Sequence, residues 1–377
     1  MVRYSLSVRG LAAWLTVTAC GIAVSAAAAA EKPAAPKKTP HVEVVFCLDT
    51  TGSMTGLIDA AKQKIWAISN QIATGRPTPQ LKIGLVAYRD RGDEYITKIV
   101  PLTDDLDAIH AQLKTFVAAG GGDTPESVNQ ALDDSVNKIQ WSTDKGTLRL
   151  IFLVGDAPPH MDYPDDVKYP VTCKRAAERG IIINTVQCGP DPETRRVWQD
   201  ICTKAEGSYV QIAQDGGGMA VATPYDKDLA AINKELARTT LTYGDAAQQR
   251  DGERKKDSAA RLEPAAAAER ASFAAKSGAV AAYDLLDAVK SGKLKLDDLK
   301  QEHLPPELQK LSRPEQKAYL DRLDRRRGEL SKQAVDLDKK RSAYIGKKLA
   351  ESGKKDAFDA QVVQMLQKQA QRYGIDY

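Results

Sequence analysis

The chain has 377 residues, of which 42% are hydrophobic and 28% are charged. This length and composition allow at least one ordinary globular core and suggest two or three domains. The 54 basic and 50 acidic residues leave a formal net charge of only +4, and no nucleic-acid-binding motif occurs, so nucleic acid is excluded as an expected partner.

The N-terminal segment has the pattern of a bacterial export signal. Its first ten residues include two arginines, and an apolar, alanine-rich stretch follows. Residues 1–30 are therefore expected to be a signal peptide, which would place the protein in the periplasm or cell envelope. The sequence VTAC, ending at Cys20, also resembles a lipoprotein lipobox, in which case the signal would end before a lipidated Cys20. Both possibilities stay open, and a lipid anchor at Cys20 would be the expected membrane contact.

Strands alternate with helices after a Pro- and Lys-containing linker over residues 31–40. Such alternation requires crossover connections and favours an α/β fold, with a mainly parallel, doubly wound sheet covered on both faces. In chain order, we expect a strand over 42–48, a helix over 54–72, strands over 81–88 and 95–102, helices over 106–117 and 125–139, a strand over 147–154, a helix over 174–179, a strand over 181–186, a helix over 192–205, a strand over 208–212 and a closing helix over 226–238.

The composition changes beyond residue 243. Residues 244–377 are rich in Ala, Lys, Glu, Asp and Leu and show no strand pattern, so a separate α-helical region is expected. An apolar residue recurs every seven positions from Leu323 to Tyr344, but Arg327 and Arg341 interrupt the companion seam, which makes a long coiled coil unlikely to form. The region is interpreted as helices that pack on themselves or on the first domain, or as an arm that binds a partner.

Four cysteines remain if Cys20 is set aside. Cys47 lies within a strand pattern and is interpreted as a buried apolar residue. Cys188 and Cys202 flank one loop and helix, so they are the first candidates for a disulfide in an oxidising compartment. A structural zinc site is not expected, because no Cys-x-x-Cys motif occurs and the chain has only 4 histidines.

The sequence DTTGS, from Asp49 to Ser53, follows the first strand and suggests three kinds of site. An aspartic protease requires contiguous Asp-Thr-Gly in an all-β fold, whereas here an extra threonine separates Asp49 from Gly52. A phosphoryl-transfer enzyme of the ion-pump kind has lysine where Thr50 stands. Its soluble relatives carry a second aspartate for proton transfer where Thr51 stands. Neither alternative fits well.

The third kind of site binds a divalent metal ion through oxygen atoms. Asp49, Thr51 and Ser53 alternate along one short turn, so their side chains can point into the same hollow. A hard divalent cation prefers about six oxygen ligands. Thr124, in a glycine-rich loop before a helix, and Asp156, directly after a buried strand, can supply two more. Asp49 and Asp156 lie where strands end, which is where ligands bind in open α/β sheets.

This set of residues resembles the metal-ion-dependent adhesion site (MIDAS) of von Willebrand factor type A (VWA) domains. The resemblance extends from residue 41 to about residue 243, with Thr51 where many relatives have serine. The motifs YRD at 88–90 and GGGDTPE at 120–126 are similar to those of an alpha-kinase-linked VWA subgroup. No kinase domain is discernible, so no kinase activity is expected.

The resemblance implies a six-strand domain that holds Mg²⁺ or Mn²⁺ on Asp49, Thr51, Ser53, Thr124 and Asp156. An acidic side chain of a protein partner would complete the coordination of the ion. The implied function is therefore a metal-dependent, adhesion-type binding module and not an enzyme. Two alternatives stay open: a scaffold whose C-terminal helices bind the partner, and a metal-dependent hydrolase that uses Asp49 or His160.

Three further residues are expected near the rim of this site. Asp90 follows the second strand and could orient ligands or waters, or lie in a solvated loop. Asp123 could play the same role, or cap a helix. His160, in a Pro-Pro-His turn, is interpreted chiefly as a loop-capping residue.

Overall fold

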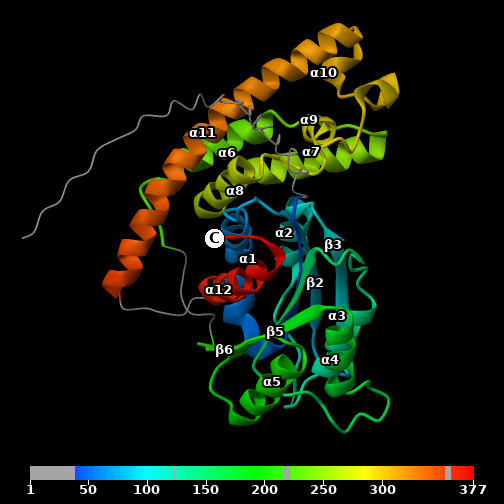
Figure 1. Ribbon diagram of the computed structural model, residues 1–377, viewed down its shortest axis with the longest axis vertical. Helices are drawn as coiled ribbons and strands as arrows, with labels where there is room; N and C mark the ends of the chain where they lie inside the picture. The colour runs from blue at the N-terminus through cyan, green and yellow to red at the C-terminus, as the bar shows by residue number, and fades with distance from the viewer. Residues whose placement is uncertain (1–38, 123, 215–220, 353–357) are drawn as a thin grey trace, which may run out of the picture. The chain divides into compact units, whose positions relative to one another are not determined.

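A computed structural model describes residues 39–122, 124–214, 221–352 and 358–377 (Figure 1). The expected signal segment, Cys20 and most of the linker lie outside the described residues, and so does Asp123. Among the described helices, none combines the length and the apolar character that crossing a membrane requires.

A six-stranded sheet is the centre of the first part of the chain, with strand order β3-β2-β1-β4-β5-β6. Neighbouring strands are parallel except for β2 and β3, which are antiparallel. The predicted mainly parallel, doubly wound sheet is therefore confirmed. Its strands are β1 (His41–Asp49), β2 (Gln80–Tyr88), β3 (Thr97–Thr103), β4 (Thr147–Gly155), β5 (Ile181–Cys188) and β6 (Tyr209–Ile212).

Helices cover both faces of the sheet because side chains alternate between the faces along each strand. In β1, Val44 and Phe46 belong to one hydrophobic core, whereas Val45 and Cys47 belong to the core on the opposite face. The first face is covered by α1 (Thr55–Ile72), α2 (Leu106–Thr115) and α12 (Phe358–Ala370), and the second by α3 (Val128–Asn137), α4 (Tyr169–Glu178) and α5 (Pro192–Lys204).

An all-helical part lies between β6 and α12 in the sequence, and this confirms the predicted helical region. One apolar cluster joins α6, α8 and α11, and a second joins α9, α10 and α11. The region also packs on the sheet domain, since α8 contacts α1. Its helices are α6 (Asp226–Arg238), α7 (Ala246–Ala260), α8 (Pro264–Ser277), α9 (Leu285–Lys290), α10 (Pro306–Gln309) and α11 (Arg313–Ser352).

The helix that completes the α1 face of the sheet comes from residues far along the chain. In Figure 1, α12 lies beside α1. Its residue Leu366 is fully buried in the same core as β1 and α1. Asn184 of β5 and Gln369 of α12 exchange amide hydrogen bonds of 3.0 and 2.8 Å. The helix α6, which was expected to close the domain after β6, packs instead against α7, α8 and α11. Residues 226–352 are thus inserted between two elements of one layered fold.

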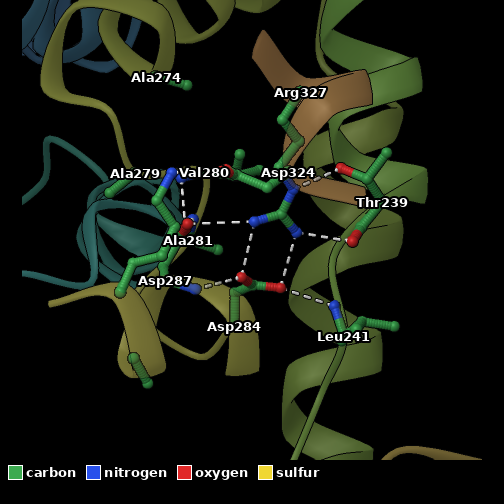
Figure 2. A network of polar contacts seen from close by, with 12 residues as sticks. Thr239, Leu241, Ala274, Ala279, Val280, Ala281, Asp284, Asp287, Asp324 and Arg327 are labelled. Carbon is green, nitrogen blue, oxygen red and sulfur yellow. Dashed lines mark hydrogen bonds and ion pairs between the residues drawn. The ribbon is translucent and has the colours of Figure 1, made fainter. Parts of the chain in front are cut away.

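The two arginines that interrupt the apolar seam of α11 are centres of buried ion pairs, and Figure 2 shows the network around Arg327. Arg327 donates to both carboxylate oxygens of Asp284 at 2.8 Å, and to the carbonyl oxygen of Thr239 at 2.6 Å. Arg341 donates to Asp226 at 2.7 Å. Both arginines therefore tie α11 to neighbouring helices within one chain, a role that heptad spacing alone does not reveal.

The helix expected from residue 125 begins three residues later, at Val128. The preceding backbone is used to join two loops, since the amide of Glu126 donates to the carbonyl of Pro158 at 2.9 Å. Ser127 occupies the N-cap position, but its hydroxyl donates to Asp90 at 2.7 Å. The pairing of the loops therefore outweighs the tendency of Pro125 to start a helix.

The predicted disulfide between Cys188 and Cys202 is wrong. Both cysteines are free thiols, as are Cys47 and Cys173, and all four are buried. Cys188 points into the core on the α1 face of the sheet, whereas Cys202 belongs to α5, which covers the other face. The alternation of side chains along β5 therefore separates two cysteines that are close in sequence.

Candidate metal centre

The turn after β1 brings three of the five candidate ligands together. Asp49 is the last residue of β1, and a short 3-10 turn over Gly52–Met54 leads into α1. One carboxylate oxygen of Asp49, Oδ1, accepts hydrogen bonds from the backbone amide of Thr51 at 2.8 Å and from its hydroxyl at 2.7 Å. The Thr51 hydroxyl lies 3.2 Å from the Ser53 hydroxyl. The three side chains thus form one group of oxygen atoms.

The second carboxylate oxygen of Asp49, Oδ2, is buried and has no hydrogen-bond partner. Burial, reinforced by the negative charge of Asp156, raises the pKa of Asp49 from 3.8 to about 7. A buried acceptor without a partner is costly, and a second carboxylate nearby increases that cost. A cation placed between the two carboxylates would satisfy both.

Gly155 allows the ends of β1, β2 and β4 to approach one another at this point. A Cβ atom on Gly155 would lie 2.4 Å from the hydroxyl of Tyr88 and 3.0 Å from Oδ2 of Asp49. Contacts this short are not tolerated, so a side chain here would push the loop that carries Asp156 away from Asp49. The glycine before Asp156 is therefore part of the geometry of the site.

Thr124 lies in a segment that is held against both groups of ligands. On one side, Gly121 lies against Thr51, since a Cβ on that glycine would be 3.2 Å from the Thr51 Cβ. On the other side, the amides of Glu126 and His160 pair with carbonyls across the two loops, at 2.9 and 3.0 Å. The Thr124 side chain is exposed and makes no hydrogen bond to the other candidates among the described contacts. The structure brings its loop to the site without fixing its hydroxyl.

A buried arginine, Arg89, holds the turn after β1 through hydrogen bonds to backbone carbonyls. Arg89 donates to the carbonyl of Thr50 at 3.2 Å and to that of Val117 at 2.7 Å. The hydroxyl of Thr50 donates to the carbonyl of Tyr88 at 2.8 Å. These bonds join the turn after β1, the loop after β2 and the loop before α3, so the backbone around the candidate ligands is held on several sides.

Asp90 and His160 meet in a polar cluster beside the candidate ligands. Asp90 is buried and not solvated, and it accepts hydrogen bonds from Ser127 and from the hydroxyl of Tyr163. His160 Nε2 lies 3.3 Å from Asp90, and its other ring nitrogen lies 2.8 Å from Asp162. The described contacts join these residues to rim loops and not to the candidate ligands. Their place is consistent with holding the loops together.

Two polar residues near the candidate ligands, Glu126 and Gln214, were not predicted from the sequence. Glu126 is buried, its Oε2 atom has no hydrogen-bond partner, and burial, with repulsion from Asp49 and other acids, raises its pKa to about 9. Gln214 follows β6 and donates to Asp156 at 2.6 Å. The GGGDTPE motif contained Glu126 and could have drawn attention to it. Nothing in the local sequence distinguishes Gln214.

The donor set fits a hard divalent cation better than a softer metal ion that prefers His or Cys ligands. Two carboxylates and three hydroxyls are oxygen ligands of the kind that Mg²⁺ and Mn²⁺ accept, with water completing the coordination. In the part of the chain that the structure describes, no group of three or more His, Cys, Asp or Glu residues could hold a metal ion. A site here would therefore depend on hydroxyl groups, and on the orphaned oxygen of Asp49.

Comparison with known proteins is consistent with this fold. The family model of the von Willebrand factor A domain matches residues 43–224. The mouse von Willebrand factor A domain-containing protein 7 is 29% identical over 209 residues, which is 54% of this chain and 22% of that protein. The chain thus spans less than a quarter of the length of that relative.

Among solved structures, BatB from Bacteroides thetaiotaomicron is 18% identical, covers 46% of this chain and 90% of its own, and has a TM-score of 0.36. Proximal thread matrix protein 1 from the mussel byssus, with a zinc-occupied MIDAS motif, is 14% identical, covers 47% of this chain and 43% of its own, and has a TM-score of 0.36. The family match, the sheet topology and the strand-end residues agree: residues 43–224 of this chain form a von Willebrand factor A domain.

Proposed function

We propose that this domain is a protein-binding module that depends on a divalent cation, Mg²⁺ or Mn²⁺. Asp49, Thr51, Ser53, Thr124 and Asp156 would hold the ion, directly or through water. The bound cation would supply a Lewis-acidic position that an acidic side chain of a partner protein can occupy. The expected export signal would place that partner in the periplasm or cell envelope, and this location stays a prediction.

The observation that carries the proposal is the environment of Asp49. Its Oδ2 atom is fully buried without a partner, while its other oxygen is held by Thr51. Asp156 contributes a second negative charge close enough to raise the pKa of Asp49. Removing the cost of these groups requires either a proton or a cation. A cation suits two carboxylates with hydroxyls beside them better than a single proton does.

Access to the site supports binding by an external group. Ser53 and Thr124 are exposed, whereas Asp49 and Thr51 are buried beneath them. An ion held by these residues would be protected on the protein side and open towards solvent. A carboxylate from another protein could then reach it from outside.

A binding role is favoured over the hydrolase alternative by the position of His160. Its Nδ1 atom is hydrogen-bonded to Asp162 at 2.8 Å, and its Nε2 atom faces Asp90 at 3.3 Å without making a hydrogen bond. A general base must lie within hydrogen-bond reach of the proton that it removes. The described contacts of His160 lead away from Asp49 and Asp156, and we therefore propose no catalytic role for it.

Replacement of Asp49 by asparagine is the test that separates metal binding from folding. Asparagine keeps the shape and the oxygen that accepts from Thr51, but removes the charge. We expect Asp49→Asn to abolish Mn²⁺ binding measured by calorimetry, and to leave the metal-free protein as stable as the wild type or more stable. Asp59→Asn, an exposed aspartate on α1, is the matched control and should bind like the wild type.

The same variants test the role of the metal in partner capture. Immobilised wild-type protein should retain a partner from an envelope extract in Mg²⁺ and release it in chelator, whereas Asp49→Asn should retain none. Capture that is unaffected by chelator and by Asp49→Asn would instead favour the scaffold alternative, in which the helical region binds. A wild-type chain that binds no Mn²⁺ at millimolar concentration would contradict the proposal.

A further inference from the structure

Gln214 connects the segment after β6 to the candidate metal centre. Its side-chain amide donates to Oδ2 of Asp156 at 2.6 Å. The same nitrogen lies 3.4 Å from the backbone carbonyl of Ser53. One amide group therefore lies between the loop that carries Asp156 and the turn that carries Ser53, although these residues follow different strands.

The loop after β5 leaves space for this side chain. Gly189 has a φ of +76°, and a Cβ atom on it would lie 2.3 Å from the Oε1 atom of Gln214. The backbone of Gly189 is itself fixed to β6, since its amide donates to Ile212 at 3.0 Å and its carbonyl accepts from Gln211 at 2.9 Å. A residue other than glycine would collide with the Gln214 amide. Glycine at this position therefore leaves room for the Gln214 amide beside Asp156.

The contact with Asp156 has a physical purpose if the site binds a cation. Without an ion, the carboxylates of Asp49 and Asp156 repel each other, and Asp156, which is only half-buried, could turn towards solvent. A hydrogen bond donated to a carboxylate stabilises its charge and selects its orientation. Groups that orient metal ligands in this way contribute strongly to metal affinity.

We propose that Gln214 is a positioning residue of the metal site, whose amide holds the Asp156 carboxylate in place for the cation. This inference rests on the proposed function, because it assigns Gln214 a role in the same site. Gln214 does not itself need to touch the ion. It acts through Asp156 and prepares the site before the cation arrives.

The test compares Gln214→Met with the wild-type full chain. Methionine keeps the length of the side chain but has no amide to donate. We expect Mn²⁺ affinity, measured by calorimetry, to fall about 10-fold to 100-fold, the effect typical of losing a group that orients a metal ligand. The urea midpoint of the metal-free protein should stay unchanged, because Gln214 is exposed. This split between affinity and stability is the readout that a merely structural role would not produce.

Gln199→Met is the matched control, since Gln199 is an exposed glutamine on α5 whose side chain makes no described contact with Asp156 or with the Gly189 loop. It should bind Mn²⁺ like the wild type. Equal affinities of the wild type and Gln214→Met would overturn the role of Gln214 and leave the proposed function standing. A loss of affinity that comes with an equal loss of metal-free stability would also overturn it. Absence of Mn²⁺ binding by the wild type would overturn the proposed function, and this inference with it.

Discussion

At Asp49, burial and charge act in the same direction. Both disfavour the ionised carboxylate, and the raised pKa of about 7 follows from them. For Asp49 to be fully ionised at neutral pH, a positive charge must lie close to its carboxylate. Without one, the residue lowers the stability of the folded chain, and this cost is the price of keeping a site ready to bind.

The stability of the metal-free protein should therefore fall as pH rises. In the unfolded chain Asp49 loses its proton near pH 3.8, whereas in the folded chain it does so near 7. Below pH 3.8 the protonated Asp49 contributes its full share to the free energy of unfolding. That share, on the order of a few kcal/mol, is lost between about pH 4 and pH 7. Glu126, whose pKa is raised to about 9, extends the same trend upwards. Urea midpoints measured in chelator from pH 5 to pH 8 check this.

Asp49→Asn is the control for this pH dependence. Asparagine cannot ionise, so the fall in stability between pH 5 and pH 7 should be smaller in this variant. Mn²⁺ affinity of the wild type should change in the opposite direction and increase with pH, because the ion competes with the proton. A wild-type urea midpoint that is constant from pH 5 to pH 8 would show that Asp49 is not held at a raised pKa.

Residues that act within one turn could be found from the sequence, and residues that act across the fold could not. Asp49, Thr51 and Ser53 alternate over five positions, so their convergence depends on local geometry alone. Thr124 and Asp156 were recognisable because each follows a strand or lies in a glycine-rich loop. Gln214 and the buried state of Asp90 depend on which loops meet at the strand ends, and no local pattern records that.

At the scale of elements, the apolar seam of α11 is interrupted by two arginines, and these arginines hold the helix to its neighbours through buried ion pairs. Its seam is apolar at Leu330 and Ala334, and charged at Arg327 and Arg341. In the sequence, these charges indicate that a long coiled coil does not form. The heptad spacing does not reveal their acidic partners, which lie on α6, on α8 and at the start of α9, in segments distant in sequence.

Truncation of Arg327 should weaken the helical region strongly. Arg327→Ala would leave Asp284 buried, with its charge unpaired, and we expect a loss of about 3–5 kcal/mol in the free energy of unfolding. Urea unfolding followed by circular dichroism measures this loss. Arg326→Ala is the control, because Arg326 is exposed and its pair with Glu329 lies on the surface. A change in Arg327→Ala no larger than that in Arg326→Ala would show that the network in Figure 2 contributes little.

At the scale of the whole molecule, alternation of strands and helices was sufficient to predict the sheet. It was not sufficient to predict which helices cover it. An amphipathic pattern shows that a helix has an apolar face, but it does not show which surface that face meets. The apolar faces of α6 and α12 are alike in this respect, and only the three-dimensional structure assigns α12 to the sheet and α6 to the helical insertion.

The position of α12 predicts that the sheet and the helical region unfold together. Leu366→Ala should cost about 2–5 kcal/mol, because the side chain is fully buried against the sheet domain. The described tryptophans, Trp66, Trp141 and Trp198, all lie in the sheet domain, and Trp66 also contacts Phe273 of α8. Their fluorescence therefore reports on the sheet domain and on its contact with α8. The urea midpoint by fluorescence and by circular dichroism should decrease in parallel.

Gln364→Ala provides the control in the same helix, since Gln364 is exposed. It should leave both midpoints within experimental error of the wild type. A Leu366→Ala variant that changes the circular dichroism transition but not the fluorescence transition would contradict the proposed packing of α12. Removal of residues 250–377 as a test of the scaffold alternative would also remove α12, so point substitutions in the helical region are the cleaner choice.

The return of α12 to the sheet also has a consequence for synthesis. Residues 41–49 form the central strand, yet the core beside them stays open until residues 358–370 have left the ribosome. Contacts between such distant parts of a chain form slowly, and the uncovered apolar face is exposed to aggregation until they do. The core on this face of the sheet is therefore completed only after α12 has been synthesised.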